Sequence, residues 1–407
     1  MVCRGCGSQT IEPILSLGET PLANSYPRPQ DLAAGEPRFP LDLVRCTTCA
    51  LVQITEVVPP EVLFRDYLYL SSYSTTMLEH ARVLVERLVA ERKLGPDSLA
   101  VEVASNDGYL LQYYLKAGVP VLGIEPARNV AEIAERERGV RTVAEFFDDK
   151  LAAELRASGT TADVIHANNV LAHVADLNRF VQGFRVLLGD EGVVVSESPY
   201  LKPFLERCEF DTIYHEHLYY YSLTALDRLF RRHQLVIEDC EHLPIHGGSL
   251  RIFARRQEVA KVRDSVKTLL AEEAAWGVDR AEPYARFAGQ VERVKSDVVK
   301  LVRELRAAGH EVAAYGAAAK GSTLLNTTGL NEKDLSFVCD RNPLKQGRLM
   351  PGAHVPIVSP DELGKRQPPY CLILAWNLAD EIMRIHSDYR ARGGKFIIPV
   401  PTVKVIG

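Results

Sequence analysis

The sequence predicts an α/β protein made of a small cysteine-framed module, a doubly wound sheet and a second α/β unit. Two Cys-x-x-Cys pairs frame the first part of the chain. Short apolar strands then alternate with helical patterns between about 99 and 197, and the alternation starts again at 311. Such alternation is typical of parallel sheets covered by helices. With 407 residues, of which 46% are hydrophobic and 25% charged, the chain has room for two or three globular domains.

The first predicted element, residues 1–72, is rich in Pro and Gly, so we expect a loop-rich module with little apolar core. Its two pairs are Cys3-x-x-Cys6 and Cys46-x-x-Cys49. Four thiolates suit a tetrahedral Zn²⁺ and leave no open position, which predicts a structural zinc site that helps the module to fold. Unliganded thiols are the alternative. A redox role is not expected, because neither pair follows a strand of a thioredoxin-like unit. The isolated cysteines are predicted to be core residues, namely Cys208, Cys240, Cys339 and Cys371.

The second element, residues 73–256, holds the most informative stretch, VEVASNDGYLL. A strand at 99–104 runs into Asn106-Asp107-Gly108, where a helix is predicted from about 107. The next strand, 120–125, ends at Glu125 and precedes a helix at 128–138; further strands are predicted at 163–167 and 192–197. The first turn of a helix presents backbone N–H groups to a ligand, and an acidic residue at the tip of the second strand can accept ribose hydroxyls. The pattern therefore indicates an adenosine-containing cofactor.

No Gly-x-Gly-x-x-Gly motif follows the first strand, so a pyrophosphate is not expected there. Acidic groups on both sides of the turn favour a cationic, phosphate-free cofactor, S-adenosylmethionine. The predicted cofactor-binding residues flank this turn and the ends of the neighbouring strands: Glu102, Ser105, Asn106, Gly108, Tyr109, Leu110, Glu125, Pro126, Asn168 and Asn169.

A cluster of ionisable residues, Tyr214-His215-Glu216-His217, follows the strand that ends near 197. The spacing does not match H-E-x-x-H, which excludes a zinc protease. In an extended chain His215 and His217 would share one face and Glu216 the other. A neutral imidazole can abstract a moderately acidic proton, and tyrosine hydroxyls can stabilise the resulting oxyanion. We expect this cluster at the edge of the sheet formed by the carboxyl ends of its strands, where α/β proteins bind ligands.

Three further groups are candidates for the same site. His173 follows the strand at 163–167, although it could instead cap the next helix. His246 lies in His246-Gly247-Gly248-Ser249. Tyr67, Tyr69 and Tyr73 could roof the site or stack in a domain interface.

The third and fourth elements are a helical connector, 257–308, and a second α/β unit, 309–407. The connector carries an apolar stripe of Val291, Val294, Val298, Leu301 and Leu305. Strands of the second unit are predicted at 311–315, 335–339, 371–375 and 395–400. Its glycine turn, 316–321, is not a Walker A loop, because Lys320 precedes the second glycine. Lys320, the turn and Asn377 could hold the diphosphate of a nucleotide-sugar; a merely structural turn is the alternative.

The net charge and the lengths of the apolar runs limit the kinds of partner that the protein can have. A net charge of −5 argues against nucleic acid, whose binders carry a basic face. No N-terminal signal and no apolar run of membrane-spanning length is found in the sequence, so we expect a cytoplasmic protein that does not use a membrane. The sequence does not reveal the oligomeric state.

Taken together, several motifs resemble those of the S-adenosylmethionine-dependent sugar C-methyltransferases that act on nucleotide-linked keto sugars. The resemblance spans the chain and is carried by the following motifs: the cysteine module, VEVASNDGYLL with GIEPA, ANNVLAHV, IYHEH, HGGSLR, YGAAAKGSTLLNTTGL, LKQGRLMPGAHVPI and LAWNLADEI. It implies an N-terminal zinc domain, a central class I methyltransferase domain and a C-terminal Rossmann-like domain that helps to hold the nucleotide-sugar.

The resemblance also implies roles for residues. His217 matches the general base, Tyr214 and Glu216 flank it, and His173 matches a second active-site histidine. Tyr69 is predicted as a further catalytic residue from its place in the tyrosine-rich stretch, not from the resemblance. His246, Lys320 and Asn377 are assigned to substrate binding. Some relatives carry aspartate at the position of His215, which is therefore given no role.

The predicted reaction is methylation at C3 of a 4-keto deoxysugar, with dTDP as the expected nucleotide. The ketone acidifies the C3 proton, so a base can form an enolate that takes the methyl group. Two alternatives remain at this point: a nicotinamide-dependent keto-sugar reductase or epimerase using the second α/β unit, and a zinc-ribbon binding protein without catalysis.

Overall fold

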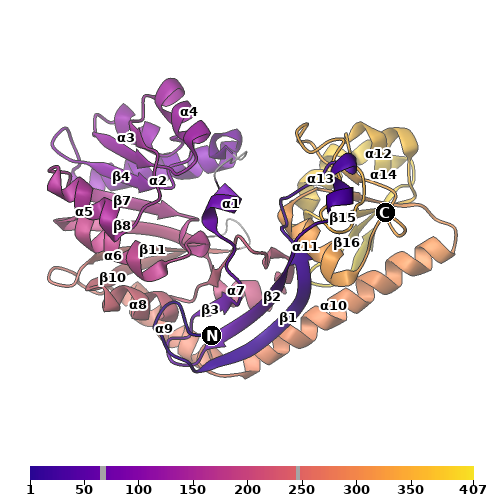
Figure 1. The fold of residues 1–407 in the computed structure, drawn as a ribbon, viewed down its shortest axis with the longest axis horizontal. Coiled ribbons are helices and arrows are strands. Elements are labelled where there is room, and N and C mark those ends of the chain that lie inside the picture. The colour runs from indigo at the N-terminus through magenta and orange to yellow at the C-terminus, as the bar shows by residue number, and fades with distance from the viewer. Residues whose placement is uncertain (65–69, 244–247) are drawn as a thin grey trace.

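The structure is a computed structural model that describes residues 1–64, 70–243 and 248–407. Two α/β units stand side by side, and a long hairpin from the N-terminal module lies between their lower ends (Figure 1). Buried residues of the three parts, among them Leu41, Val194 and Val312, belong to one contiguous apolar cluster. The three parts therefore pack as one body.

The N-terminal module is built on an antiparallel sheet, so the expectation of a loop-rich module was wrong. Its order is β1-β2-β3-β9, with bounds Ile11–Pro21, Arg38–Cys46, Val52–Ile54 and Tyr219–Tyr220. Register shifts between Pro13 and Leu15 and between Ser16 and Glu19 interrupt the alternation of β1, which hides the strand in the sequence. The fourth strand belongs to the segment that follows His217, so the sheet joins the module to the central unit.

The central unit contains a seven-stranded sheet of order β10-β11-β8-β7-β4-β5-β6. All neighbouring pairs are parallel except those that β11 makes. The strands are Ala100–Val103, Val121–Ile124, Thr142–Val143, Ala162–Asn168, Leu188–Pro199, Leu235–Leu243 and Ser249–Arg256, from β4 to β8 and then β10 and β11. The predicted doubly wound sheet is confirmed.

Helices cover this sheet on both faces (Figure 1). They are α2 Thr75–Arg92, α3 Leu111–Lys116, α4 Arg128–Arg138, α5 Asp149–Ala157, α6 Leu177–Leu187, α7 Leu201–Glu206 and α8 Leu223–Arg232. Helix α3 begins four residues later than the predicted start near 107. The reason is local, because Asn106 and Gly108 have φ values of 49° and 76°, which a helix does not accommodate.

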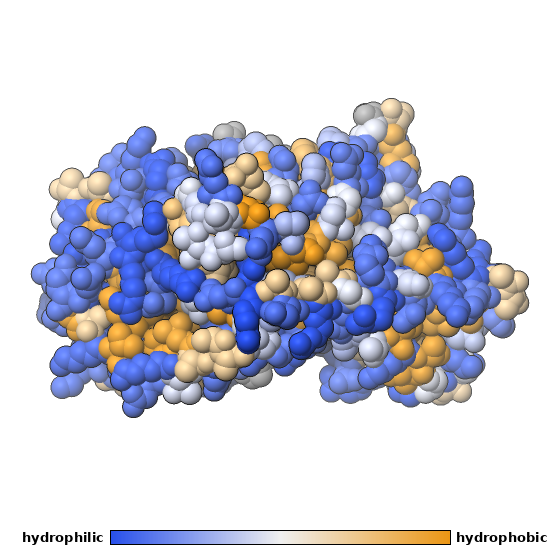
Figure 2. All heavy atoms as spheres, turned by 90° about the horizontal axis from the view of Figure 1, so that it is seen from below, coloured by the Kyte–Doolittle hydropathy of each residue, from blue (hydrophilic) through white to orange (hydrophobic). Residues whose placement is uncertain are grey.

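The predicted connector forms two helices, α9 Asp264–Trp276 and α10 Glu282–Ala307. Gly277, with φ 101°, ends the first. Helix α10 runs beneath both α/β units (Figure 1) and buries Val291, Val294 and Val298 of the predicted stripe. Seen from below, hydrophilic residues cover much of the surface between scattered hydrophobic patches (Figure 2).

The C-terminal unit has a six-stranded sheet of order β14-β13-β12-β15-β16-β17, parallel except at β17. Its strands are β12 Val312–Tyr315, β13 Val338–Cys339, β14 Ile357–Val358, β15 Tyr370–Ile373, β16 Lys395–Ile398 and β17 Lys404–Ile406. Its helices are α11 Ala319–Thr328, α12 Asp361–Arg366, α13 Ala379–Ile385 and α14 Ser387–Ala391. Of the predicted strand 335–339, only Val338–Cys339 forms a strand, β13. None of the helices in the described part of the chain is long and apolar enough to cross a membrane.

Candidate active site

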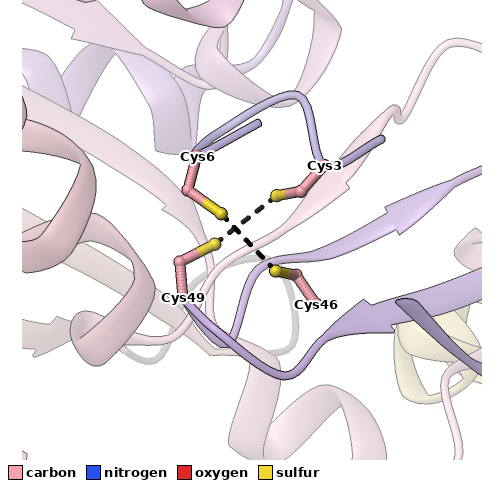
Figure 3. Close-up of side chains that lie close together, drawn as sticks. All are labelled: Cys3, Cys6, Cys46 and Cys49. Atoms are coloured by element: carbon pink, nitrogen blue, oxygen red, sulfur yellow. Dashed lines mark hydrogen bonds between the residues drawn. The ribbon is translucent and has the colours of Figure 1, made fainter. Parts of the chain in front are cut away.

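The four predicted metal ligands converge at one point, although they come from two segments (Figure 3). Cys3 Sγ lies 3.5 Å from Cys49 Sγ, and Cys6 Sγ lies 3.6 Å from Cys46 Sγ. All four sulfurs lie within 4.8 Å of one another. A tetrahedron with metal–sulfur distances of ~2.3 Å has sulfur–sulfur edges of about 3.8 Å, so the donor set fits Zn²⁺. With four protein ligands the site is structural. The other four cysteines are buried, as predicted.

The predicted cofactor turn lies at the carboxyl end of β4, next to the end of β5. Glu125 accepts hydrogen bonds from the backbone N–H groups of Asn106 and Ala127, each at 3.0 Å. Asn106 Oδ1 accepts from the Ser71 N–H at 2.8 Å, which ties the turn to the segment before α2. At Gly108 a Cβ atom would lie 3.0 Å from Val140, and its φ is left-handed, so this position requires glycine.

Three carboxylates gather at this turn, from Glu102, Asp107 and Glu125. Burial, followed by the charges of Asp107 and Glu125, raises the pKa of Glu102 well above its ordinary range. Burial likewise raises the pKa of Glu125. Among the described residues, nothing bonds to Glu102 Oε2 or Ser105 Oγ. A site with acidic groups and unpartnered buried oxygens fits a ligand that carries positive charge and hydrogen-bond donors, as S-adenosylmethionine does.

The other predicted cofactor residues lie in three places. Tyr109 and Leu110 are buried in an apolar cluster with residues of α2 and α3. Pro126 is half-buried. Asn168 and Asn169 end β7 on the same sheet edge as the turn, and Asn169, with φ 56°, donates its N–H to the Glu197 carbonyl at 2.8 Å.

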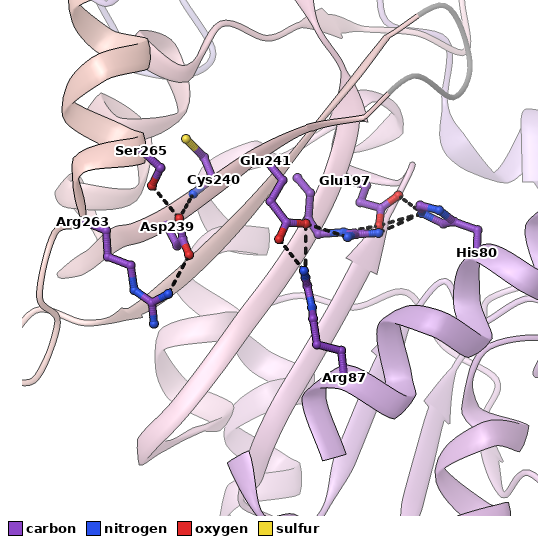
Figure 4. Close-up of polar contacts among 9 residues, drawn as sticks. His80, Arg87, Glu197, Asp239, Cys240, Glu241, Arg263 and Ser265 are labelled. Carbon is purple, nitrogen blue, oxygen red and sulfur yellow. Dashed lines mark hydrogen bonds and ion pairs between the residues drawn. The ribbon is translucent and has the colours of Figure 1, made fainter. Parts of the chain in front are cut away.

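A polar network that the sequence did not reveal holds this sheet edge together (Figure 4). The Glu197 carboxylate pairs with Arg251 Nε at 2.7 Å and with His80 Nε2 of α2 at 2.9 Å. Burial alone would raise the pKa of Glu197, but His80 and Arg251 outweigh it and lower that pKa. Glu241 joins Arg251 to Arg87, a second α2 residue. The network therefore fixes α2 against β8, β10 and β11.

The Tyr214–His217 segment forms a tight turn, in which the His217 N–H bonds to the Tyr214 carbonyl at 2.8 Å. It is not extended, so His215 and His217 do not share a face. His215 points to the N-terminal hairpin, where its Nε2–H donates to the Pro40 carbonyl at 3.1 Å. Glu216 is buried and accepts from Asn24 Nδ2 at 2.7 Å.

His217 is held in one tautomer. Its Nδ1 lies 3.0 Å from the Thr212 carbonyl, which can only accept, so Nδ1 carries the proton. The basic nitrogen is therefore Nε2, which lies 3.0 Å from the Tyr214 hydroxyl and accepts from it. The His173 ring meets the His217 ring edge to face, with centroids 5.0 Å apart. The structure thus brings three of the predicted catalytic side chains together.

Burial sets the charge of these rings. It lowers the pKa of His217 to about 3, with His173 as the next cause, and it lowers the pKa of His173 to about 4. Both imidazoles are neutral at pH 7, and a neutral imidazole can accept a proton.

The C-terminal unit contributes Lys320 and Asn377 to the same region. Lys320 Nζ donates to Asn377 Oδ1 at 2.9 Å and lies 4.7 Å from the centroid of the Trp376 ring. Its charge acts on His217, whose pKa it helps to lower. Thr323 Oγ1 of α11 donates to the Ile213 carbonyl at 3.0 Å, next to the Tyr214 turn. The predicted substrate residues thus approach the predicted base from the other unit.

In the glycine turn before α11, two backbone N–H groups already have hydrogen-bond partners within the protein. The Ala317 N–H donates to Asp340 Oδ2 at 2.7 Å, and the Ala318 N–H donates to the Gly316 carbonyl at 2.8 Å. Helix α11 begins at Ala319, and the first N–H groups of a helix have no intrahelical partner. Those donors and Lys320 are groups that can bind an anion.

Two predicted site residues, Tyr69 and His246, and also Tyr67, lie outside the described residues. Tyr73 is 82% exposed, so it neither roofs the site nor packs in a domain interface.

Two features were not predicted from the sequence: Asn24, and the contact between Asp211 and Trp376. In that contact the indole N–H donates to Asp211 Oδ2 at 2.6 Å. An acidic residue just before the Tyr214 segment was a usable signal for Asp211. Asn24 had none, because its partner lies in a distant part of the chain.

Comparison with known proteins agrees with this organisation. Residues 3–64 match a family model described as "Putative zinc binding domain", residues 75–239 match "Methyltransferase domain", and residues 244–401 match "C-methyltransferase C-terminal domain". The chain is 38% identical over 405 residues to the C-methyltransferase NovU of Streptomyces niveus, covering 99% of this chain and 96% of that protein.

Two of the solved structures that match are more distant relatives than NovU. The magnesium protoporphyrin IX methyltransferase of Synechocystis PCC 6803 with bound SAM shares 14% identity, with a TM-score of 0.35, over 44% of this chain and 79% of that one. A S-adenosylmethionine-dependent methyltransferase from Clostridium acetobutylicum ATCC 824 shares 13%, with a TM-score of 0.35, over 43% and 90%. These two likenesses are too weak to support an argument.

The relative that matches along almost the full length, together with the three domain models in the same order, establishes the family. The cofactor is S-adenosylmethionine, and the four cysteines form a zinc site. The chain belongs to the S-adenosylmethionine-dependent C-methyltransferases that carry an N-terminal zinc-binding domain.

Proposed function

We propose that this C-methyltransferase methylates C3 of a nucleotide-linked 4-keto deoxysugar, with His217 as the general base. The observation that carries the proposal is the fixed tautomer of His217. Thr212 holds the proton on Nδ1, so the lone pair of Nε2 is directed to the Tyr214 hydroxyl and the region in front of it. Enolate formation requires a base and a hydroxyl side by side. When the sugar opens the bond between them, Nε2 is free to take the C3 proton and the Tyr214 O–H is free to donate to the ketone oxygen.

The depressed pKa of His217 has a consequence for this chemistry. A ring with a pKa of about 3 is neutral but weakly basic. It takes a proton favourably only when a negative charge forms beside it, because a nearby opposite charge raises the pKa of an imidazole. The enolate is such a charge. Proton transfer to His217 and enolate stabilisation by Tyr214 are therefore expected to occur together.

S-adenosylmethionine supplies the methyl group as an electrophile on a sulfonium. The residues proposed to hold it are those of the turn after β4, with Glu125 for the ribose hydroxyls and Glu102 for a donor of the amino-acid end. Asn168 and Asn169 lie at the adjoining end of β7. In this arrangement the cofactor and the His217 turn face one sheet edge, where α/β proteins bind their ligands.

The C-terminal unit is proposed to hold the nucleotide diphosphate, with dTDP as the expected nucleotide. Lys320 and the first turn of α11 supply donors, and Asn377 orients the lysine. In this proposal residues 1–72 hold zinc, 73–256 bind the methyl donor, 257–308 connect the units and 309–407 bind the nucleotide-sugar.

The test is incubation of the zinc-loaded protein with S-adenosylmethionine and a series of dTDP-4-keto deoxysugars. We expect a product heavier by one CH₂ group, and we expect deuterium exchange at C3 in D₂O. His217→Asn should lower methyl transfer and C3 exchange by about 10²- to 10⁴-fold, the usual contribution of a general base, and leave cofactor affinity unchanged.

His215→Asn is the matched control, because His215 contacts Pro40 on the opposite side of the turn. Its activity should equal that of the wild type. Retained C3 exchange in His217→Asn would assign the base to another residue. Absence of a methylated product from every sugar in the series would contradict the proposed substrate.

A further inference from the structure

Residues 22–28, which we call the strap, connect the N-terminal hairpin to both α/β units. The strap follows β1 directly. On one side it is fixed to the C-terminal unit: Ser322 Oγ donates to the Ala23 carbonyl at 2.8 Å, and the Leu349 N–H donates to the Pro27 carbonyl at 3.0 Å. The Tyr26 hydroxyl is buried there and donates to the Ala317 carbonyl at 2.7 Å. The strap therefore has a defined position next to the glycine turn.

On its other side the strap reaches the Tyr214–His217 turn through one side chain. Asn24 Nδ2 donates to Glu216 Oε1 at 2.7 Å. The other end of the amide, Asn24 Oδ1, lies 3.2 Å from the Tyr26 hydroxyl. A carboxylate oxygen accepts, so the NH₂ group is the end of the amide that faces Glu216. Glu216 is 9% exposed, and a buried carboxylate depends on such donors.

We propose that Asn24 is a positioning residue for Glu216, and that the N-terminal zinc module acts in catalysis through it. Asn24 holds the Glu216 carboxylate in place next to His217 and favours its ionised form. The proposal rests on the proposed function, since Glu216 directly precedes His217, the general base of that function. It gives the N-terminal module a role beyond zinc binding, because the strap that carries Asn24 follows directly on its strand β1.

The charges around Glu216 support this role. Burial raises the pKa of Glu216, whereas the hydrogen bond from Asn24 and the charge of Lys345 lower it. Lys345 comes from the C-terminal unit, where its Nζ donates to the Ala317 carbonyl at 2.6 Å and lies 3.2 Å from the Tyr26 hydroxyl. His173 faces Glu216 from the central unit and bonds to its backbone. Loss of Asn24 leaves burial opposed by Lys345 alone, so the pKa of Glu216 should rise.

The experiment compares Asn24→Ala, Asn24→Asp and Ser25→Ala in the full-length, zinc-loaded protein. Ser25 is the matched control: it is the exposed neighbour of Asn24, and its hydroxyl bonds within the strap, to the Leu22 carbonyl at 2.9 Å. We expect Asn24→Ala to lower kcat about tenfold, as for loss of one hydrogen bond to a charged group, with KM for the sugar nearly unchanged. The acidic limb of its pH–rate profile should move to higher pH. Ser25→Ala should behave as the wild type.

Asn24→Asp keeps the shape but places a second carboxylate against Glu216, so its loss of kcat should exceed that of Asn24→Ala. This variant also tests the proposal if the alanine variant folds poorly. In a Glu216→Gln background, Asn24→Ala should cause no further loss, because the two residues act as a unit. Equal losses in both backgrounds, or an unchanged kcat in Asn24→Ala, would overturn the proposal.

A readout that needs no turnover separates this inference from the proposed function. The Glu216 carboxyl carbon can be assigned by NMR from the signal that Glu216→Gln removes, and its pKa can be titrated. If no sugar is methylated but that pKa rises in Asn24→Ala, the proposed substrate fails and the positioning role stands. If the wild type is active and the pKa does not move, the positioning role fails.

Discussion

The contact between Asp211 and Trp376 gives a quantitative prediction about how the two α/β units are joined. Asp211 is fully buried, and of its two oxygens Oδ2 accepts from the indole N–H at 2.6 Å. Burial raises the pKa of Asp211 to about 6, although Lys320 and Trp376 lower it in part. We expect Asp211→Asn to make the protein relatively more stable as the pH rises, because the amide keeps an oxygen for Trp376 and carries no charge.

The size of the effect follows from the pKa values. A rise from the ordinary value of 3.8 to about 6 corresponds to about 3 kcal/mol. The folded state binds this proton more tightly than the unfolded state, so folding stability falls as the pH rises from 3.8 to about 6 and is constant above that range. Asp211→Asn removes this term. The free energy lost by burying the new amide N–H groups does not depend on pH. The pH dependence of the stability difference between the two proteins therefore reports on the carboxylate.

Trp376 is a probe placed at the bond itself. The chain has two tryptophans, so a Trp276→Phe background leaves the indole N–H signal of Trp376 alone in a two-dimensional NMR spectrum. Its chemical shift should titrate with a midpoint near pH 6 and should be constant in Asp211→Asn. The free energy of unfolding of the two proteins can be measured with denaturant between about pH 5 and pH 8. Relative to the wild type, that of Asp211→Asn should increase as the pH rises. A midpoint below pH 5, or a stability difference that is the same at every pH, would contradict a raised pKa of the buried Asp211 carboxyl.

Two further predictions concern the ligand sites. Glu125→Gln should weaken S-adenosylhomocysteine binding at least about tenfold in calorimetry, because an amide NH₂ then faces the backbone N–H donor of Asn106 or Ala127. The control is Glu132→Gln, at an exposed position of α4, which should bind normally. Unchanged affinity in Glu125→Gln would remove this residue from the cofactor site. Cys46→Ser should lose zinc to a chelator that the wild type resists, measured by metal analysis, while Cys240→Ser, a buried cysteine outside the cluster, should keep it; equal retention would contradict the four-cysteine site.

Features set by local sequence could be predicted. Helix α4 has the predicted bounds, Arg128–Arg138, because Gly139 in the left-handed conformation ends it. The four cysteines meet as expected, since the spacing within each pair suits one ion. The predicted start of α3 was wrong because Asn106 adopts a positive φ. Asparagine permits this conformation, but its presence alone does not predict it.

Contacts between distant segments could not be predicted. Nothing near Asn24 indicates that it bonds to Glu216, and nothing near Trp376 indicates Asp211, because each pair forms only when separate units pack. The turn at His217 differs from an extended chain for a similar reason. Its shape depends on bonds such as that from the Leu218 N–H to the Ala172 carbonyl at 2.7 Å, which residues 214–217 alone do not specify.

The pairing of β3 with β9 bears on how the chain folds during synthesis. Val52 and Gln53 pair with Tyr220 and Tyr219, so the last strand of the N-terminal sheet is made only after most of the central unit has left the ribosome. Until then the outer edge of β3 is open, and an open strand edge invites association with other chains. Early zinc capture by Cys3, Cys6, Cys46 and Cys49 can hold the nascent hairpin, but it cannot close this edge. An isolated N-terminal fragment should therefore aggregate even when it is loaded with zinc.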